Sequence, residues 1–149
     1  MEVWAGCAFP DDVVYDLDSD TWVRDLGGGV AEVGMTDVSQ SRSGRLVQVG
    51  WKDNGRRVVR GRPLCVIESA KWVGPMRSPL TGVLVADNRS AFDADIAAAN
   101  RDPYGLGWFA RIEMESPQEL AGLAEAGEAF EHYRRIIDET GLRCFRCAD

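Results

Sequence analysis

The sequence predicts a mostly β fold, a sandwich or barrel accompanied by a few short helices. Short apolar runs recur along the chain, and glycine-containing turns such as Gly27-Gly28-Gly29 and Asn54-Gly55 separate them. Few stretches have the longer apolar spacing that a helix requires. Because 149 residues can bury a proper core, we expect one domain built from these short strands.

The first half of the chain predicts strands and one short helix. Residues 15–18 and 21–24 are expected to pair as strands, and residues 30–34 continue after the glycine turn. Thr36 is a good N-cap for a helix over residues 37–42, and Gly44 is a natural stop for it. A strand over residues 46–51 follows, and Asn54-Gly55 favours a hairpin turn after it.

The second half predicts a buried central strand, further strands and two longer helices. Residues 64–67 and 82–86 are apolar enough to be buried strands, and residues 108–114 alternate as a strand. Ser90 is expected to cap a helix with Phe92, Ile96 and Ala99 on one face. Residues 116–119 form a capping-box pattern, and a final helix over residues 129–139 is expected to end at Gly141.

Composition divides the chain into segments and excludes several classes of partner. We expect an N-terminal arm (1–14), one domain (15–140) and a C-terminal tail (141–149). The net charge of −7 argues against nucleic-acid binding, and no apolar run is long enough to span a membrane. The N-terminus has no basic segment typical of a signal peptide, so four cysteines predict reduced thiols in a cytoplasmic protein. The chain is expected to be monomeric.

Lys71 is the residue most suited to carry chemistry. The chain has two lysines, Lys52 and Lys71, against fifteen arginines. An arginine stays protonated, whereas a lysine amine can lose a proton and form an amide. Lys71 lies in a short polar turn between two apolar runs, so its side chain is expected to project into solvent. The opposing view, that Lys71 is an ordinary exposed lysine, would hold for the turn taken alone.

Five sequence blocks resemble the glycine cleavage H-protein family of lipoyl carriers. The motif Glu68-Ser69-Ala70-Lys71 resembles the attachment motif of that family. The other blocks, in the family's order, are residues 22–24, 33–37, 78–82 with Asn88, and 100–108. The resemblance covers residues 15–133. It implies a lipoyl-domain-like barrel-sandwich hybrid, with short internal and C-terminal helices and with strands 58–67 and 78–85 on either side of the lysine.

The same resemblance implies a covalent cofactor and no catalytic residues. Lipoic acid would be joined to Lys71 as a swinging arm, placed there by a lipoate-protein ligase or a lipoyl transferase. Glu68 and Ser69 would serve recognition by that enzyme, and Trp72 would stack on the lipoyl chain or on a partner. Such a protein presents its cofactor to partner enzymes and performs no catalysis itself. No metal site is expected.

Several departures from the family pattern point to one branch of it. Asp20-Thr21 stands where the family usually has a His-Glu pair, and Trp72 to Pro75 stand where small residues and Ser-Asp are usual. These residues resemble the lipoate-binding H-protein-like proteins that work with a heterodisulfide-reductase-like complex in sulfur oxidation. We therefore expect that role first. The alternative is glycine cleavage, with glycine decarboxylase, aminomethyltransferase and dihydrolipoamide dehydrogenase as partners.

The cysteines raise a competing functional class, a thiol oxidoreductase. Cys144 and Cys147 form a C-x-x-C pair, which a thiol oxidoreductase would use, although incidental thiols in a mobile tail are the better expectation. Cys65 is expected in the core, and Cys7 either meets the lipoyl sulfurs or is a single exposed thiol. His132 is the only histidine and predicts no catalytic role. An adaptor without a prosthetic group is the third class.

Overall fold

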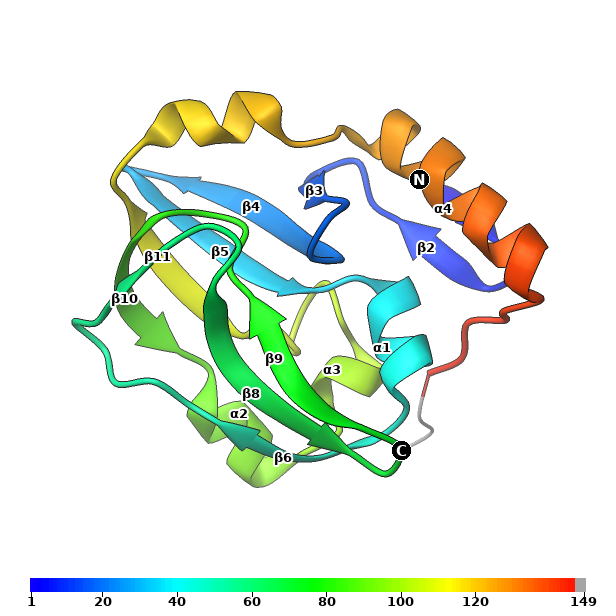
Figure 1. Ribbon diagram of the computed structural model, residues 1–149, viewed down its shortest axis with the longest axis horizontal. Coiled ribbons are helices and arrows are strands. Elements are labelled where there is room, and N and C mark those ends of the chain that lie inside the picture. Colours follow the sequence, from blue (N-terminus) through cyan, green and yellow to red (C-terminus); the bar gives the residue numbers. More distant parts are fainter. Residues whose placement is uncertain (147–149) are drawn as a thin grey trace.

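The computed structural model describes residues 1–146 and contains three antiparallel sheets (Figure 1). Six strands pair in the order β3-β4-β5-β11-β10-β7, three in the order β6-β8-β9, and β1 pairs with β2. The strands are β1 (Glu2–Trp4), β2 (Cys7–Phe9), β3 (Val14–Asp16), β4 (Thr21–Gly27), β5 (Val30–Met35), β6 (Leu46–Gly50), β7 (Arg57–Val58), β8 (Pro63–Ser69), β9 (Val73–Arg77), β10 (Gly82–Asp87) and β11 (Ala110–Met114). The predicted mostly β architecture is confirmed.

Helices are short except for the last. They are α1 (Asp37–Ser43), α2 (Arg89–Ala94), α3 (Ala98–Arg101), a 3-10 helix (Pro117–Gly122) and α4 (Ala126–Thr140). Among residues 1–146, no helix combines the length and the apolar character that crossing a membrane requires. The predicted caps of α1 are confirmed, because Thr36 Oγ1 accepts a hydrogen bond from Ser39 N and Gly44 follows the last turn.

Two hydrophobic cores hold these layers together. One core lies between the six-stranded and three-stranded sheets and includes Leu46, Ile67 and Ile112. The other lies beneath α4, where Tyr133 and Ile137 pack against the N-terminal hairpin and Trp22. The apolar stripe predicted for the final helix is therefore correct, and the helix starts three residues earlier than expected. Gly141, with φ of 72°, ends it in the left-handed conformation that favours glycine.

Two predicted elements are wrong in detail. The single helix expected after Ser90 is two short helices, because Asp95 takes an extended conformation and ends α2. The predicted capping box is absent at Ser116. Glu119 points elsewhere, and its carboxylate accepts hydrogen bonds from Thr81 N at 2.9 Å and from Thr81 Oγ1 at 3.2 Å. A tertiary partner thus outcompetes the local cap.

The hairpin that follows the central strand also differs from prediction. Its second strand is β9, residues 73–77, and not residues 78–85, of which only 82–85 form a strand, as part of β10 in the other sheet. Pro75 lies within β9, and this strand is the edge of its sheet, where a proline removes no needed hydrogen bond. Asn54-Gly55 likewise forms a turn without forming a hairpin, because β6 pairs with β8 and β7 pairs with β10.

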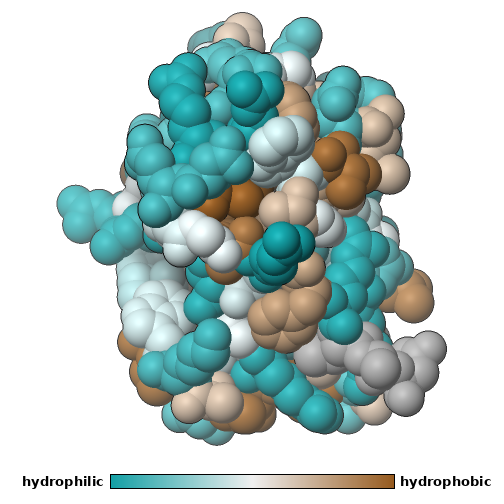
Figure 2. Space-filling model, turned by 90° about the vertical axis from the view of Figure 1, so that its right-hand side faces the viewer, coloured by the Kyte–Doolittle hydropathy of each residue, from teal (hydrophilic) through white to brown (hydrophobic). Residues whose placement is uncertain are grey.

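Segments near both ends of the described residues, 2–9 and 144–146, pack against the domain. The first residues form the β1–β2 hairpin, and Phe9 stacks on Tyr133 of α4 with ring centroids 5.7 Å apart. A disulfide joins Cys7 of β2 to Cys144. In Figure 2, where the right-hand side of Figure 1 faces the viewer, hydrophilic side chains dominate the surface and hydrophobic ones appear in separate patches.

Candidate functional site

Lys71 lies at the exposed tip of the β8–β9 hairpin. The two strands pair through Glu68 and Val73, and residues 70–72 close the turn between them. Lys71 is exposed, as its place in a polar turn predicts. β8 pairs with β9 on one side and with β6 on the other, whereas β9 is the edge strand. The tip therefore projects from a sheet in which β8 is held on both sides.

The Ser69 hydroxyl fixes the backbone on both sides of the lysine. Ser69 is almost fully buried, and its Oγ accepts hydrogen bonds from Lys71 N at 3.2 Å and from Trp72 N at 3.1 Å. Ser69 N donates to Trp72 O at 2.7 Å, and Ala70 N donates to Arg45 O at 3.2 Å. A serine in such a turn replaces backbone hydrogen bonds that the turn cannot make. Ser69 therefore positions Lys71 by shaping the turn.

Gly44 lies directly beneath the aliphatic part of the Lys71 side chain. A Cβ atom on Gly44 would stand 3.3 Å from Lys71 Cε and 3.5 Å from its Cδ. Gly44 has φ of 78° and ψ of −173°, a conformation that only glycine adopts readily. Asn100 holds this position, because its Nδ2 donates to Gly44 O at 3.0 Å and its Oδ1 accepts from Leu46 N at 2.9 Å.

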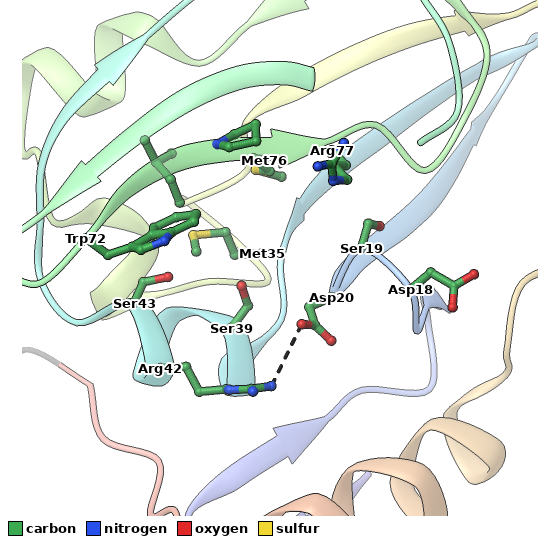
Figure 3. Close-up of a pocket in the computed structure, with 12 residues that line it drawn as sticks. Asp18, Ser19, Asp20, Met35, Ser39, Arg42, Ser43, Trp72, Met76 and Arg77 are labelled. Atoms are coloured by element: carbon green, nitrogen blue, oxygen red, sulfur yellow. Dashed lines mark ion pairs between the residues drawn. The ribbon is translucent and has the colours of Figure 1, made fainter. Parts of the chain in front are cut away.

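A cleft of about 420 Å³ opens beside the tip, between the hairpin, α1 and the turn that precedes β4 (Figure 3). Trp72 is the residue of the tip that lines it. The lining is part apolar and part charged, and it consists of Asp18, Ser19, Asp20, Met35, Ser39, Arg42, Ser43, Ile67, Trp72, Pro75, Met76 and Arg77. The cleft therefore offers a long apolar group a surface next to polar side chains.

The indole of Trp72 forms one wall of the cleft. It is 46% exposed, and its ring lies over Gly74, where a Cβ atom would stand 2.3 Å from Trp72 Cζ2. Figure 3 shows Trp72 close to Met35 and on the same side of the cleft as Met76. Thioether and aromatic groups pack well against irregular apolar partners. This wall suits an aliphatic chain.

Asp20 marks the polar side of the cleft. Its Oδ1 accepts a hydrogen bond from Tyr133 OH at 2.9 Å, and its Oδ2 lies 3.9 Å from Arg42 Nη1. Burial raises the pKa of Asp20 above its usual range, although Tyr133 and Arg42 oppose the shift. Asp20 also has φ of 56°, which is unusual for a residue with a side chain. Asp20 thus lines the cleft while its carboxylate contacts both Tyr133 and Arg42.

Glu68 lies away from the cleft. Successive residues of a strand point to opposite faces, and Ile67 lines the cleft, so the exposed Glu68 faces the other side of the sheet. Of the four predicted site residues, the structure thus brings Ser69, Lys71 and Trp72 together at the tip. Asp20, Arg42 and Gly44 were missed by the sequence analysis. The signals were a departure from the family pattern at Asp20 and a glycine after a predicted helix.

The cysteines differ from the reduced thiols that the sequence predicts. Cys7 is bonded to Cys144, so it is neither an exposed thiol nor paired with the cofactor. Cys144, the first cysteine of the C-x-x-C pair, is joined to Cys7 and is therefore not an incidental free thiol, and Cys147 lies outside the described residues. Cys65 is buried as predicted, and burial raises its thiol pKa to about 12. Across residues 1–146, no three His, Cys, Asp or Glu side chains gather as a metal site would require.

Comparisons with known proteins agree with this geometry. The model of the family described as glycine cleavage H-protein matches residues 14–136. The chain is 36% identical to a probable glycine cleavage system H protein 2 of Sulfolobus acidocaldarius, over 98% of this chain and 99% of that one. It is also 36% identical to glycine cleavage system H protein 3 of Aquifex aeolicus, over 97% and 91%. A crystal structure of a glycine cleavage system H protein from Mycobacterium marinum superposes with a TM-score of 0.73, at 29% identity, over 83% of this chain and 98% of that one.

Proposed function

The chain belongs to the glycine cleavage H-protein family, whose members carry lipoate covalently on a lysine, and we propose that Lys71 is the lysine that carries it here. The observation that supports Lys71 is its place at the exposed hairpin tip. Lys52, the other lysine, is partly buried and its ammonium group donates a hydrogen bond to Pro63 O. A modifying enzyme can therefore reach the amine of Lys71 more readily.

The residues around Lys71 fit a lipoyl group. When attached, that group supplies a dithiolane, which can hold a carried group or two electrons. The Lys71 amide would remove the positive charge, and the Ser69 turn would hold the attachment point in one orientation. Trp72, Met35 and Met76 would cover the apolar part of the arm, and the Asp20 and Arg42 side would meet its carried end. The protein positions and shields; its partners perform the chemistry.

We propose glycine cleavage as the circuit, because the named relatives are H proteins of that system. The carried group would then be an aminomethyl group, which is cationic when protonated. Asp18 and Asp20 place carboxylates on the cleft that would complement such a charge. The partners would be glycine decarboxylase, aminomethyltransferase and dihydrolipoamide dehydrogenase. In this proposal the protein itself has no catalytic residue.

Sulfur oxidation is the second candidate, and the cleft gives one specific reason to keep it. Arg42 and Arg77 also line the cleft, and they would complement an anionic sulfur group better than a cationic one. Trp72 and Pro75 form walls at positions where the family usually has small residues and Ser-Asp. The names of the relatives say nothing of a heterodisulfide-reductase-like complex, which is the reason for placing this candidate second.

One assay separates these circuits. Protein lipoylated in vitro by a lipoate-protein ligase is mixed with glycine decarboxylase, glycine and labelled bicarbonate, and label entering glycine is measured. The proposal predicts exchange with the lipoylated wild type and none with Lys71→Arg. Absence of exchange in a fully lipoylated sample, while an authentic H protein works in parallel, would refute the glycine cleavage circuit and favour the second candidate.

A further inference from the structure

The disulfide that closes the two ends of the chain joins sulfurs in unequal surroundings. Cys7 and Cys144 are 137 residues apart, and their Cα atoms lie 4.9 Å from each other. Cys7 is fully buried in strand β2. Cys144 is partly exposed and belongs to a segment, residues 142–146, without helix or strand. The Cys144 sulfur is therefore the one that a solvent-borne thiol would reach first.

The segment beyond Cys144 is held mainly by polar contacts. Cys144 N donates to Ala5 O at 3.0 Å, and Phe145 N donates to Ser41 Oγ at 3.2 Å. The side chain of Gln40 donates through Nε2 to Phe145 O at 2.6 Å. The Phe145 side chain itself stays about half exposed, so little apolar burial secures this segment. Without the disulfide, only these exchangeable contacts would keep it in place.

These contacts end on α1, the helix that also shapes the site. Arg146 adds an ion pair to the buried Asp37, with Arg146 Nη2 3.3 Å from Asp37 Oδ2. Asp37, Gln40 and Ser41 of α1 thus contact the chain end. Ser39, Arg42 and Ser43 of the same helix line the cleft. Gly44, directly after α1, lies against the Lys71 side chain. The chain end and the proposed attachment point therefore contact the same short helix.

We propose that Cys7 and Cys144 form a thiol–disulfide exchange site that takes a dithiol reductant, and that its reduction releases the chain end from α1. A thiolate of the dithiol attacks Cys144 Sγ, the bond to Cys7 breaks, and Cys7 leaves as a thiolate that takes up a proton. The second thiol of the reductant then attacks the mixed disulfide. Cys144 leaves as a thiol, and the reductant closes its own disulfide, so two electrons and two protons are transferred.

Reduction would leave the fold of the domain intact. Phe9 holds the N-terminal hairpin through aromatic contacts with Phe130 and Tyr133, and these contacts do not involve the disulfide. Asp37 would lose Arg146 but would keep hydrogen bonds from Ala8 N at 2.9 Å and Gln40 Nε2 at 2.8 Å. The expected change is confined to the chain end and to α1.

The test uses the unlipoylated full-length chain, so that it does not depend on the proposed function. The oxidised protein is incubated with excess dihydrolipoamide under native conditions, thiols are alkylated, and labelled cysteines are located by peptide mass. We expect Cys7 and Cys144 to become labelled, and hydrogen exchange of the α1 amides to rise at least severalfold. In Cys144→Ser the exchange should be high with or without the dithiol. Cys147→Ser is the matched control, and it should respond as the wild type does.

Two results would overturn the proposal. Labelling of Cys7 and Cys144 only after denaturation would show a structural cross-link that dithiols do not reach. Labelling under native conditions without faster exchange in α1 would show that the disulfide does not hold the chain end.

A further arm identifies the source of the dithiol, with the lipoyl group reduced by dihydrolipoamide dehydrogenase and NADH and no free dithiol added. If the Cys7–Cys144 disulfide is reduced in the lipoylated wild type but not in Lys71→Arg, the reductant is the chain's own lipoyl arm. If the disulfide is reduced in neither protein, the reductant is a free dithiol.

Discussion

Substituting Gly44 by alanine tests whether this glycine positions Lys71. With φ of 78° and ψ of −173°, Gly44 has a backbone conformation that costs a residue with a Cβ atom about 1–3 kcal/mol. We expect the free energy of unfolding to fall by that amount. The new methyl group would also stand 3.3 Å from Lys71 Cε, which is tighter than ordinary contact, so the lysine side chain must move.

The displacement should be visible in the rate of lipoylation. A shift of about 1 Å can slow a positioned reaction on the order of a hundredfold, but the lysine chain is flexible, so we expect a loss of roughly two- to tenfold. Stability is measured by urea unfolding, and the modification rate by mass spectrometry with a lipoate-protein ligase in limiting amount. For each protein, Gly44→Ala and wild type, both measurements are made on one preparation.

Gly55→Ala supplies the matched control. Gly55 also has a positive φ, of 90°, but a Cβ atom there would meet nothing within 4 Å. It lies in the turn before β7, and its N–H bonds to Leu84 O of β10, away from the hairpin tip. This variant should lose stability and be lipoylated at the wild-type rate. If Gly44→Ala is also lipoylated at the wild-type rate, Gly44 does not position the Lys71 amine.

Three further predictions concern buried groups. Trp22→Phe removes the hydrogen bond from Trp22 Nε1 to Pro103 O at 2.8 Å in the interior, so urea unfolding should show a loss of about 1–3 kcal/mol. The pKa of Asp20 is higher in the folded state than in the unfolded state, so the folded state binds the proton more tightly. The stability that this proton contributes is fully present below the unfolded pKa of about 3.9, and it is lost as pH rises through the folded pKa. Asp20→Asn, which tolerates the positive φ, should therefore gain stability relative to the wild type as pH rises across that window; an unchanged difference would contradict the shift. Burial raises the pKa of Cys65 to about 12, so iodoacetamide at pH 8 should label it only after unfolding.

The sequence predicts the fold where local chemistry decides it. The glycine turn before β5, the Thr36 cap of α1 and the apolar stripe of α4 depend on neighbouring residues and are all present. Predictions fail where a distant partner intervenes. Glu119 bonds to Thr81 in place of capping its own helix, and the second strand of the hairpin is residues 73–77 in place of 78–85, because residues 82–85 belong to β10, which pairs with β11 of the other sheet.

The site shows the same division. The exposure of Lys71 and the burial of Cys65 follow from the pattern of the chain around them. The cleft does not, because it assembles Asp20, Arg42 and Trp72 from three segments that are far apart in the sequence. The disulfide is equally invisible locally, since Cys7 and Cys144 meet only when the two chain ends pack on α1 and α4. Spacing marks Cys144 and Cys147 as a C-x-x-C pair and does not relate Cys144 to Cys7.

Peptide mass spectrometry after lipoylation tests the central claim most directly. The wild type, Lys71→Arg and Lys52→Arg are each incubated with a lipoate-protein ligase, lipoate and ATP, and the modified peptide is identified. We expect one lipoyl group on Lys71 in the wild type and in Lys52→Arg, and none in Lys71→Arg. A lipoyl group on Lys52, or an unmodified wild type when an authentic H protein is modified in parallel, would contradict it.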